Sequence, residues 1–308
     1  NMKKTLKYII IGLFTLVMYS CTEEFIEPDN EKPIVSGDKI SFFADQDNPN
    51  NTKGIELTNA NFTKFNVFAY SSVGLFNTTP TMTPFINNLT VSKSGNNWNY
   101  TGSYYWPASG YLHFYGVATD GASSGFPLGV TNWTAPNAQG YPKFSFQTQN
   151  TIANVKDLVT AKTKDKNMFN NTGRVALSFE HVLSEINFKI TNSYGTTTRI
   201  KKITVSNIIK QGDYTFNANK GLWSFSTAAS NKETIVFWSG SQDISNNGNA
   251  NYTERLFVIP STGIQVKIDY QTASNWDPLW WFPTNRNITL NLPAVDIGDN
   301  KRFNLTID

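Results

Sequence analysis

The stretch VALSFEHVLSEI, residues 175–186, decides between an all-β fold and a mixed fold, because it is the one segment of the chain that has a helical alternative. Its first half alternates apolar and polar residues as a strand does, and its second half spaces apolar residues as on one face of a helix. The alternating residues are Val175, Leu177 and Phe179, and the helically spaced ones are Val182, Leu183 and Ile186. Strand patterns flank the stretch on both sides, and we therefore interpret it as strand.

Strand patterns continue outward from this stretch in both directions. Alternating or apolar runs bounded by turn residues recur, among them FTKFNVFAY, YLHFYGVA, PKFSFQTQ, RIKKITVSNI, ETIVFWS and GIQVKIDYQ. Charged residues make up 16% of the chain, against about 25% in a typical globular protein. Asn, Thr, Ser and aromatic residues take their place, and this composition suits pleated strands joined by tight turns. We therefore predict an all-β fold.

Length and one polar interruption predict two domains. About 270 residues follow the leader and tether described below, which is enough for two β-sandwiches. The segment TKDKNMFNNTG, residues 163–173, is the most polar interruption between strong strand patterns. We predict an N-terminal β-sandwich domain at residues 39–168 and a C-terminal one at residues 169–308.

The N-terminal residues have the order of a secretory signal. Lys3, Lys4 and Lys7 precede an apolar run at residues 8–18, and Cys21, the one cysteine of the chain, comes just after it. The run is shorter than the ~20 apolar residues that a membrane-spanning helix needs. The segment is therefore interpreted as a cleaved leader.

The cysteine behind the leader predicts a lipid anchor. The segment LVMYSC, residues 16–21, resembles the lipobox of bacterial lipoproteins, which implies that residues 1–20 are a lipoprotein signal peptide and that Cys21 is lipidated. Residues 21–38 then form a tether, and the membrane is contacted through the lipid anchor only. The acidic TEE at residues 22–24 resembles an export tag for the outer surface of Bacteroidetes-type cells, with an ordinary solvated linker as the alternative.

The chain without its leader is close to neutral. The whole sequence has 26 basic and 23 acidic residues, and removal of the three leader lysines leaves 23 of each sign, since 26 − 3 = 23. Proteins that bind nucleic acid carry a basic surface patch. We therefore expect no nucleic-acid partner.

The sequence offers little for catalysis or metal binding. His113 and His181 are its two histidines, and both lie inside strand patterns, where a structural role is the expected one. Two distant histidines without clustered carboxylates do not make a zinc site. Phosphate-binding loops and nucleophile elbows are missing from the sequence. We expect no cofactor and no metal, and a protein that is not an enzyme, with a hydrolase as a remote alternative.

Four segments in order along the chain carry a family resemblance. They are FTKFNVFAY, GSYYWPASGYLHFYGVA, VALSFEHVLSEINFKI and ERLFVIPSTGIQVKIDY. Together with the lipobox, they resemble the fimbrillins, particularly the Mfa-like ones, which are lipoprotein precursors of type V pilus subunits in Bacteroidetes-type bacteria. The resemblance implies two transthyretin-like (Greek-key) β-sandwich domains in tandem, an outer membrane lipoprotein at the cell surface, and a structural or adhesive place in a fimbrium.

The resemblance also implies assembly with other fimbrial subunits by strand exchange. In the family, a trypsin-like surface protease removes the lipidated N-terminus with the first strand, and the C-terminal strand of a neighbour fills the groove by β-augmentation. Here the first strand is KISFFA, with Ile40 and Phe42 on one face. Lys53 is the candidate cleavage site in the loop that follows. Arginine is common there in the family, and an ordinary loop lysine is the alternative.

The C-terminal segment RFNLTID is the candidate donor strand. Phe303, Leu305 and Ile307 alternate on one face. The same pattern also suits the last strand of the second sandwich. A chain whose last strand is integral accepts a strand without donating one, and this favours a tip or accessory subunit over a stalk subunit.

A second function remains open from the sequence. Trp280 and Trp281, in WDPLWWFP, are candidate aromatics for stacking on sugar rings. They would serve a glycan-binding surface lipoprotein, or a tip that binds a host or bacterial surface ligand.

Overall fold

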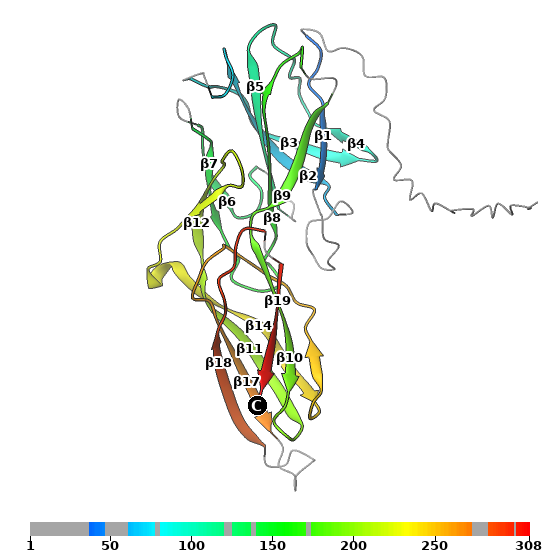
Figure 1. Ribbon diagram of the computed structural model, residues 1–308. Helices are drawn as coiled ribbons and strands as arrows, with labels where there is room; N and C mark the ends of the chain where they lie inside the picture. The colour runs from blue at the N-terminus through cyan, green and yellow to red at the C-terminus, as the bar shows by residue number, and fades with distance from the viewer. Residues whose placement is uncertain are drawn as a thin grey trace, which may run out of the picture. The chain divides into compact units, whose positions relative to one another are not determined.

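Strands and turns make up nearly all of the structure, which is a computed structural model (Figure 1). It describes residues 37–46, 61–77, 81–119, 125–136, 140–170, 174–272, 283–298 and 300–308. The one helical element in these ranges is a short 3-10 turn, η1 (Ala229–Asn231), and no α-helix occurs in them. The all-β prediction is confirmed.

Seven strands in the described ranges close into a barrel. Its order is β1-β4-β3-β2-β5-β8-β9. The bounds are β1 (Phe42–Gln46), β2 (Lys64–Ser72), β3 (Thr83–Ser94), β4 (Asn97–Asn99), β5 (Tyr111–Thr119), β8 (Leu158–Lys166) and β9 (Val175–His181). The closing strand is β1, which is antiparallel to β4 and parallel to β9.

Two further sheets pack face to face as a β-sandwich. In the first, β15 (Asn249–Asn251), β16 (Leu256–Val258) and β19 (Asn300–Ile307) pair with β10 (Ser184–Asn192). The second has the order β14-β11-β17-β18, with bounds β11 (Thr198–Ile209), β14 (Lys232–Ile244), β17 (Gln265–Thr272) and β18 (Thr284–Asn291). The rings of Phe188 in β10 and Phe237 in β14 meet edge to face, with centroids 4.8 Å apart, in the core between the sheets.

A fourth sheet joins the two parts of the chain. Its order is β13-β12-β7-β6, with bounds β6 (Val130–Thr134), β7 (Lys143–Gln147), β12 (Gln211–Thr215) and β13 (Leu222–Ser224). Because β7 pairs with β12, and β9 completes the barrel, the strand pairing crosses the boundary expected between residues 168 and 169 at two places. The described residues all belong to one compact unit. The division into two tandem domains stays a prediction.

The stretch with the helical alternative contains no helix and forms two strands, with a bend between them at Leu183. It supplies β9 and the start of β10, so the strand interpretation is confirmed. Val182 and Leu183, whose spacing resembled a helix, are both buried where the chain passes from the barrel to the sandwich. The backbone N–H of Val182 donates to Leu158 O at 3.0 Å, as a continuing strand does.

Two described strands, β6 and β15, were missed from the sequence. In β6, the ring of Trp133 stacks on Phe68 with centroids 3.6 Å apart, and its Nε1–H donates to the Tyr70 hydroxyl at 2.8 Å. Gly129, just before this short strand, and Asn132, within it, have positive φ. These interruptions hid the alternation that predicts strands elsewhere.

A buried histidine forms hydrogen bonds that connect the loops at the end of the barrel where β1 begins. His113 in β5 is fully buried, and its Nδ1 accepts the backbone N–H of Asp165 at 3.1 Å. The neutral ring therefore carries its hydrogen on Nε2 and donates it to Ser72 Oγ, 2.7 Å away. Ser72 in turn donates to Gly74 O at 2.6 Å. In this arrangement the imidazole cannot take the serine proton, so the Ser72, His113 and Asp165 constellation positions loops and does not form a nucleophilic triad.

This network predicts a pH dependence of stability. Burial lowers the pKa of His113 from its ordinary 6.5, with Asp165 opposing the effect and Lys164 adding to it. The unfolded chain then takes up a proton first as the pH falls. The contribution of His113 is therefore fully present above pH 6.5 and is lost below it.

We expect the free energy of unfolding to fall between pH 7.5 and pH 5.5 in the unmodified chain, and to fall less in His113→Gln. The difference should be at most about 1.4 kcal/mol, since one pH unit below the ordinary value corresponds to that amount. Urea unfolding at the two pH values measures it, in a range above that in which most carboxylates titrate. Equal losses in both proteins would show that His113 does not carry the effect.

Candidate functional site

The first strand of the described chain is built into the wall of the barrel. Ile40, Phe42 and Ala44 point inward and are 0%, 1% and 6% exposed, whereas Phe43 between them points outward and is 40% exposed. The strand pairs in parallel with β9 from Phe42↔Val175 to Gln46↔Phe179, and meets β4 at Phe42↔Trp98. Ile40 and Phe42 thus share one buried face, as the alternation in the sequence predicts.

Aromatic rings surround the Phe42 side chain. Its ring meets Phe65 at 6.1 Å, Phe114 at 6.0 Å and Tyr100 at 5.8 Å, all edge to face. Full burial of one such side chain stabilises a fold by roughly 1.5–3 kcal/mol, and each ring pair adds about 0.5–1.5 kcal/mol. Phe42 therefore contributes a large part of the free energy that keeps β1 in place.

Polar contacts hold the backbone of the same strand. Val175 N–H donates to Ser41 O at 2.8 Å, and Trp98 Nε1–H donates to Ala44 O at 3.1 Å. The Tyr100 hydroxyl donates to Ile40 O at 2.6 Å. Burial raises the pKa of Tyr100, with a backbone hydrogen bond opposing the effect, so this hydroxyl keeps its proton. Outside the barrel wall, the Arg174 guanidinium lies 5.5 Å from the ring of Phe43.

The strands β1 and β19 lie along the same edge of residues 175–193, the segment that forms β9 and then β10. Successive N–H groups of a strand point to opposite edges. The odd-numbered Val175 and Ser193 donate to Ser41 O and to Ile307 O, whereas the even-numbered Val182 donates to Leu158 O on the other side. Both β1 and β19 are parallel to this segment, one after the other.

The candidate donor strand is paired within this chain. The strand β19 runs parallel to β10 from Glu185↔Asn300 to Asn192↔Ile307. Leu305 and Ile307 are buried, and Phe303 is half-buried with its ring 6.1 Å from that of Phe188. This pairing matches the alternative in which the strand is integral, and donation of β19 to a neighbour stays a prediction.

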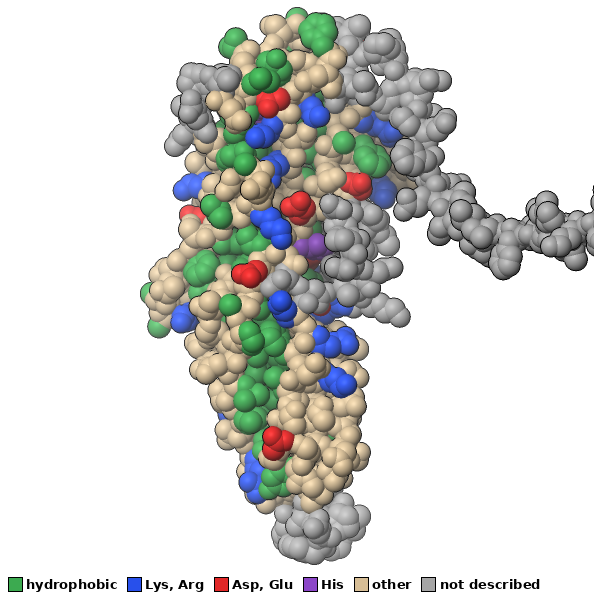
Figure 2. Space-filling model, viewed as in Figure 1, with side chains coloured by type: hydrophobic (Ala, Val, Ile, Leu, Met, Phe, Trp, Pro, Cys, Tyr) green, Lys and Arg blue, Asp and Glu red, His purple; other side chains and the backbone are tan. Residues whose placement is uncertain are grey.

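The hydrophobic core of the sandwich is only partly shielded from solvent at β18 and β19. Ile288 and Leu290 of β18 pair with core residues of β17 but are themselves half-buried, as Phe303 is. Figure 2 shows a strip of hydrophobic side chains where Figure 1 places β18 and β19. These two strands are thus edges of the sandwich.

Several predicted site residues fall outside the described ranges: Cys21, Lys53, Trp280 and Trp281. Trp98 and Trp106 are buried in the barrel. In the described part of the chain, no three His, Cys, Asp or Glu side chains come together as a metal site. Nor does that part contain a helix long and apolar enough to cross a membrane.

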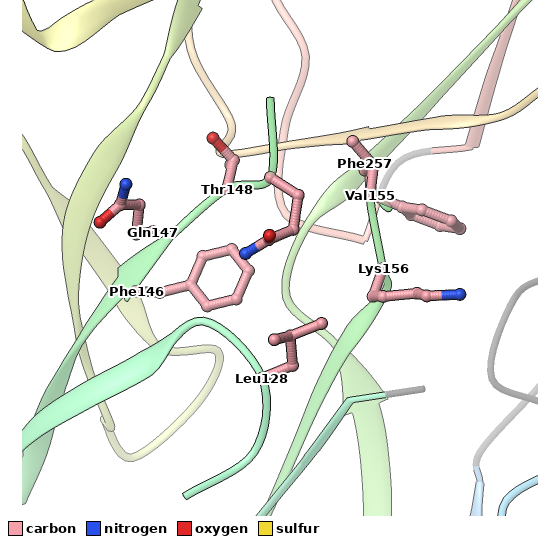
Figure 3. Close-up of a pocket in the computed structure, with 8 residues that line it drawn as sticks. Leu128, Phe146, Gln147, Thr148, Val155, Lys156 and Phe257 are labelled. Carbon is pink, nitrogen blue, oxygen red and sulfur yellow. The ribbon is translucent and has the colours of Figure 1, made fainter. Parts of the chain in front are cut away.

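One small hollow lies between the joining sheet and the sandwich (Figure 3). Its volume is about 10 Å³, and its lining is part apolar, from Leu128, Phe146, Val155 and Phe257, and part polar, from Gln147, Thr148, Gln149 and Lys156. Ligand pockets commonly measure roughly 300–1,000 Å³ and place a few convergent polar groups against the ligand. This hollow is too small to be the functional site.

The partners of β1 were the part of the site that the sequence did not predict. Trp98 binds the backbone of β1, Tyr100 binds the backbone just before it, and Phe114 packs on Phe42. Their segments were predicted as strands, but nothing in the sequence placed them beside residues 40–44. The available signal was the alternation of aromatic residues in NWNYTGSYYW, which marks one face of that segment as apolar.

Comparison with known proteins agrees with this architecture. A family model described as fimbrillin-like matches residues 36–307. None of the curated proteins compared with the chain matches it.

Solved structures are similar at low sequence identity. A candidate cell adhesion protein from Bacteroides uniformis is 12% identical with a TM-score of 0.50, over 87% of this chain and 93% of that one. One from Bacteroides eggerthii is 14% identical with a TM-score of 0.47, over 90% and 87%. The fimbrial anchor protein of Porphyromonas gingivalis is 10% identical with a TM-score of 0.34, over 77% of each chain.

The family match spans almost the whole described chain, and the resemblance that the sequence predicted is confirmed. Matched from residue 36 to residue 307 and all-β in its described ranges, the chain belongs to the fimbrillin-like family, whose place is in fimbriae at the cell surface.

Proposed function

We propose that the chain is a fimbrial subunit that accepts a strand, and that β1 is a removable plug whose place a strand of another subunit takes. The observation that carries the proposal is the position of Phe42, 1% exposed inside the barrel although its strand meets β4 at a single residue pair. Loss of β1 would open an apolar groove between β4 and β9. Such an exposed edge pairs readily with another strand.

Covalent attachment explains why the plug would stay until it is cut. An incoming strand with similar side chains gains about the same free energy as β1 provides. A tethered β1, however, acts at an effective concentration in the millimolar range or above. Cleavage in the loop after β1, for which Lys53 is the candidate site, would let β1 diffuse away and make the exchange irreversible. A trypsin-like surface protease suits a lysine at this position.

The proposal also covers how the precursor is held at the membrane and which position the subunit takes in the fimbrium. Cys21 would carry the lipid that holds the precursor at the outer membrane until cleavage. The internal pairing of β19 with β10 supports a tip or accessory subunit over a stalk subunit, because a strand that completes its own sandwich is costly to donate. Removing it would expose Leu305 and Ile307, at roughly 1.5–3 kcal/mol for each side chain.

Truncation of Phe42 tests its part in holding the plug. We expect Phe42→Ala to lower the free energy of unfolding by about 3–5 kcal/mol, because a buried ring leaves a cavity among Phe65, Tyr100 and Phe114. Phe43→Ala, one residue away on the outer face, is the matched control and should cost less than about 1 kcal/mol. Urea unfolding measures both, and similar losses from the two substitutions would contradict the assignment of faces.

Rebinding of a peptide tests the groove itself. A fluorescent peptide with the sequence of residues 38–46 should bind the protein after limited trypsin treatment, and should not bind the uncut protein. Replacement of Ile40 and Phe42 by serine in the peptide should weaken binding by 100-fold or more, since the two side chains are worth roughly 3–6 kcal/mol.

Fluorescence polarisation measures this binding, and trypsin-treated Lys53→Gln is the control for the cleavage position. Strand exchange is wrong for this chain if the cut protein keeps its own β1 and excludes the peptide at all concentrations.

A further inference from the structure

The direction of β1 determines where the body of a strand donor would lie. This step rests on the proposed function. A strand that replaces β1 and keeps its pairing runs parallel to β9, and starts where Phe42 pairs with Val175. A donated C-terminal strand is joined to its own protein at its first residue. The body of the donor must therefore sit within a few residues' reach of the barrel end where β1 begins.

The same barrel end carries an excess of exposed apolar side chains. Eight large hydrophobic residues of the described chain are exposed, and five of them lie here. These five are Phe43, Val73, Leu75, Tyr105 and Phe169, and the other three are Leu128, Leu222 and Val236. Figure 2 shows hydrophobic side chains at this end of the barrel.

Strand pairing places the loops that carry these residues together. Val73 and Leu75 follow the last residue of β2, which pairs with the first residue of β5, at Ser72↔Tyr111. Phe169 follows the end of β8, where Lys166 pairs with Leu112. Tyr105 pairs with Lys39, just before β1. All of them thus lie at the barrel end where β1 begins, in loops that follow different strands around it.

Hydrogen bonds to one aspartate hold the two loops in shape. Asp165 Oδ1 accepts the backbone N–H of Phe76 at 2.7 Å, and Asp165 O accepts the side-chain amide of Asn170 at 2.7 Å. His113 fixes the Asp165 backbone from inside the barrel. Val73 is nevertheless 91% exposed and Phe169 is 80% exposed. Ordered loops that present apolar side chains to solvent are typical of surfaces that bind another protein.

We infer that Val73, Leu75 and Phe169 form a docking surface for the body of the fimbrial subunit that donates its strand to the β1 groove. The donor subunit is the expected partner because its strand is joined to its body at the end of the groove that this surface adjoins. Lys166 and Arg174 lie three and five positions from Phe169 in the chain, so we expect an acidic rim around an apolar centre on the donor. The donated strand then provides the durable joint, and this surface sets the orientation of one subunit on the next.

Photo-crosslinking in cells that assemble the fimbriae tests the inference. A benzophenone amino acid is placed at Phe169 or Val73 in the docking surface, and at Ala176, which is exposed beside the groove opposite Phe43. Leu222, exposed elsewhere on the chain, is the control position. Adducts from purified fimbriae are identified by mass spectrometry. We expect one and the same subunit to be captured from Ala176 and from Phe169 or Val73, and not from Leu222.

The outcomes separate the two proposals. A subunit captured at Ala176 but not at Phe169 or Val73 overturns the docking surface and leaves strand exchange standing. Capture of no subunit at Ala176 overturns strand exchange, and the docking surface with it.

A paired substitution gives a second measurement. Val73→Asp with Phe169→Asp should lower the yield of the Ala176 adduct about ten-fold or more, since every 1.4 kcal/mol of lost contact is a factor of ten. Both side chains are largely exposed, so the thermal midpoint of the variant should equal that of the unmodified chain. An unchanged yield in this folded variant overturns the inference.

Discussion

The parallel pairing of β1 with β9 is the constraint on which the barrel depends. The strand β1 links β4 to β9, and without this link the remaining barrel strands form an open sheet. The link depends on a short run of inward residues, with Phe42 at its centre among aromatic rings from β2 and β5 and from the residue after β4. A parallel pair cannot be made by a tight turn, so its two strands come from distant parts of the sequence. Closure therefore depends on packing between residues that are far apart in the sequence.

Strand content could be predicted from the sequence because alternation is a local property. The segments FTKFNVFAY and GIQVKIDYQ became β2 and β17 with little change in bounds. Val182 and Leu183 had an ambiguous spacing because the chain passes there from one core to another, and consecutive residues are buried. The polar segment at residues 163–173 suggested a boundary, yet its described residues include the end of β8 and the start of a barrel-end loop. Polar residues mark exposed loops and linkers alike, and the sequence alone does not distinguish them.

The sequence predicted the residues of the first strand in the candidate site but not the residues that pack around them. Ile40 and Phe42 were placed on one face because that is a period-two pattern, and both are buried. The residues that receive them, Trp98, Tyr100 and Phe114, come from segments more than fifty positions away, and their register depends on how the sheet closes. The exposure of the apolar side chains at the barrel end could not be predicted from the sequence either. Val73 and Phe169 are apolar, as core residues are, and only the pairing of the flanking strands places them at the barrel end.

The two strands on the edge of residues 175–193 are not equivalent, and the difference suits different roles. The strand β19 is paired with β10 over eight residues and has an outer side that none of the described strands pairs with, so another strand could be added there without displacing it. The strand β1 lies between two neighbours and pairs with β9 over five residues and with β4 at one. Removing β1 exposes two strand edges and an aromatic core at once, and such an opening is an aggregation hazard unless another strand fills it. A protein that uses the opening for assembly must keep it closed until a partner is near. A strand of the same chain, such as β1, can do this without a separate chaperone protein. The short pairing of β1 and its deeply buried Phe42 then act together. In the proposed exchange, the first would limit how many hydrogen bonds must break on release, and the second would favour a replacement strand that offers a large apolar side chain at the same position.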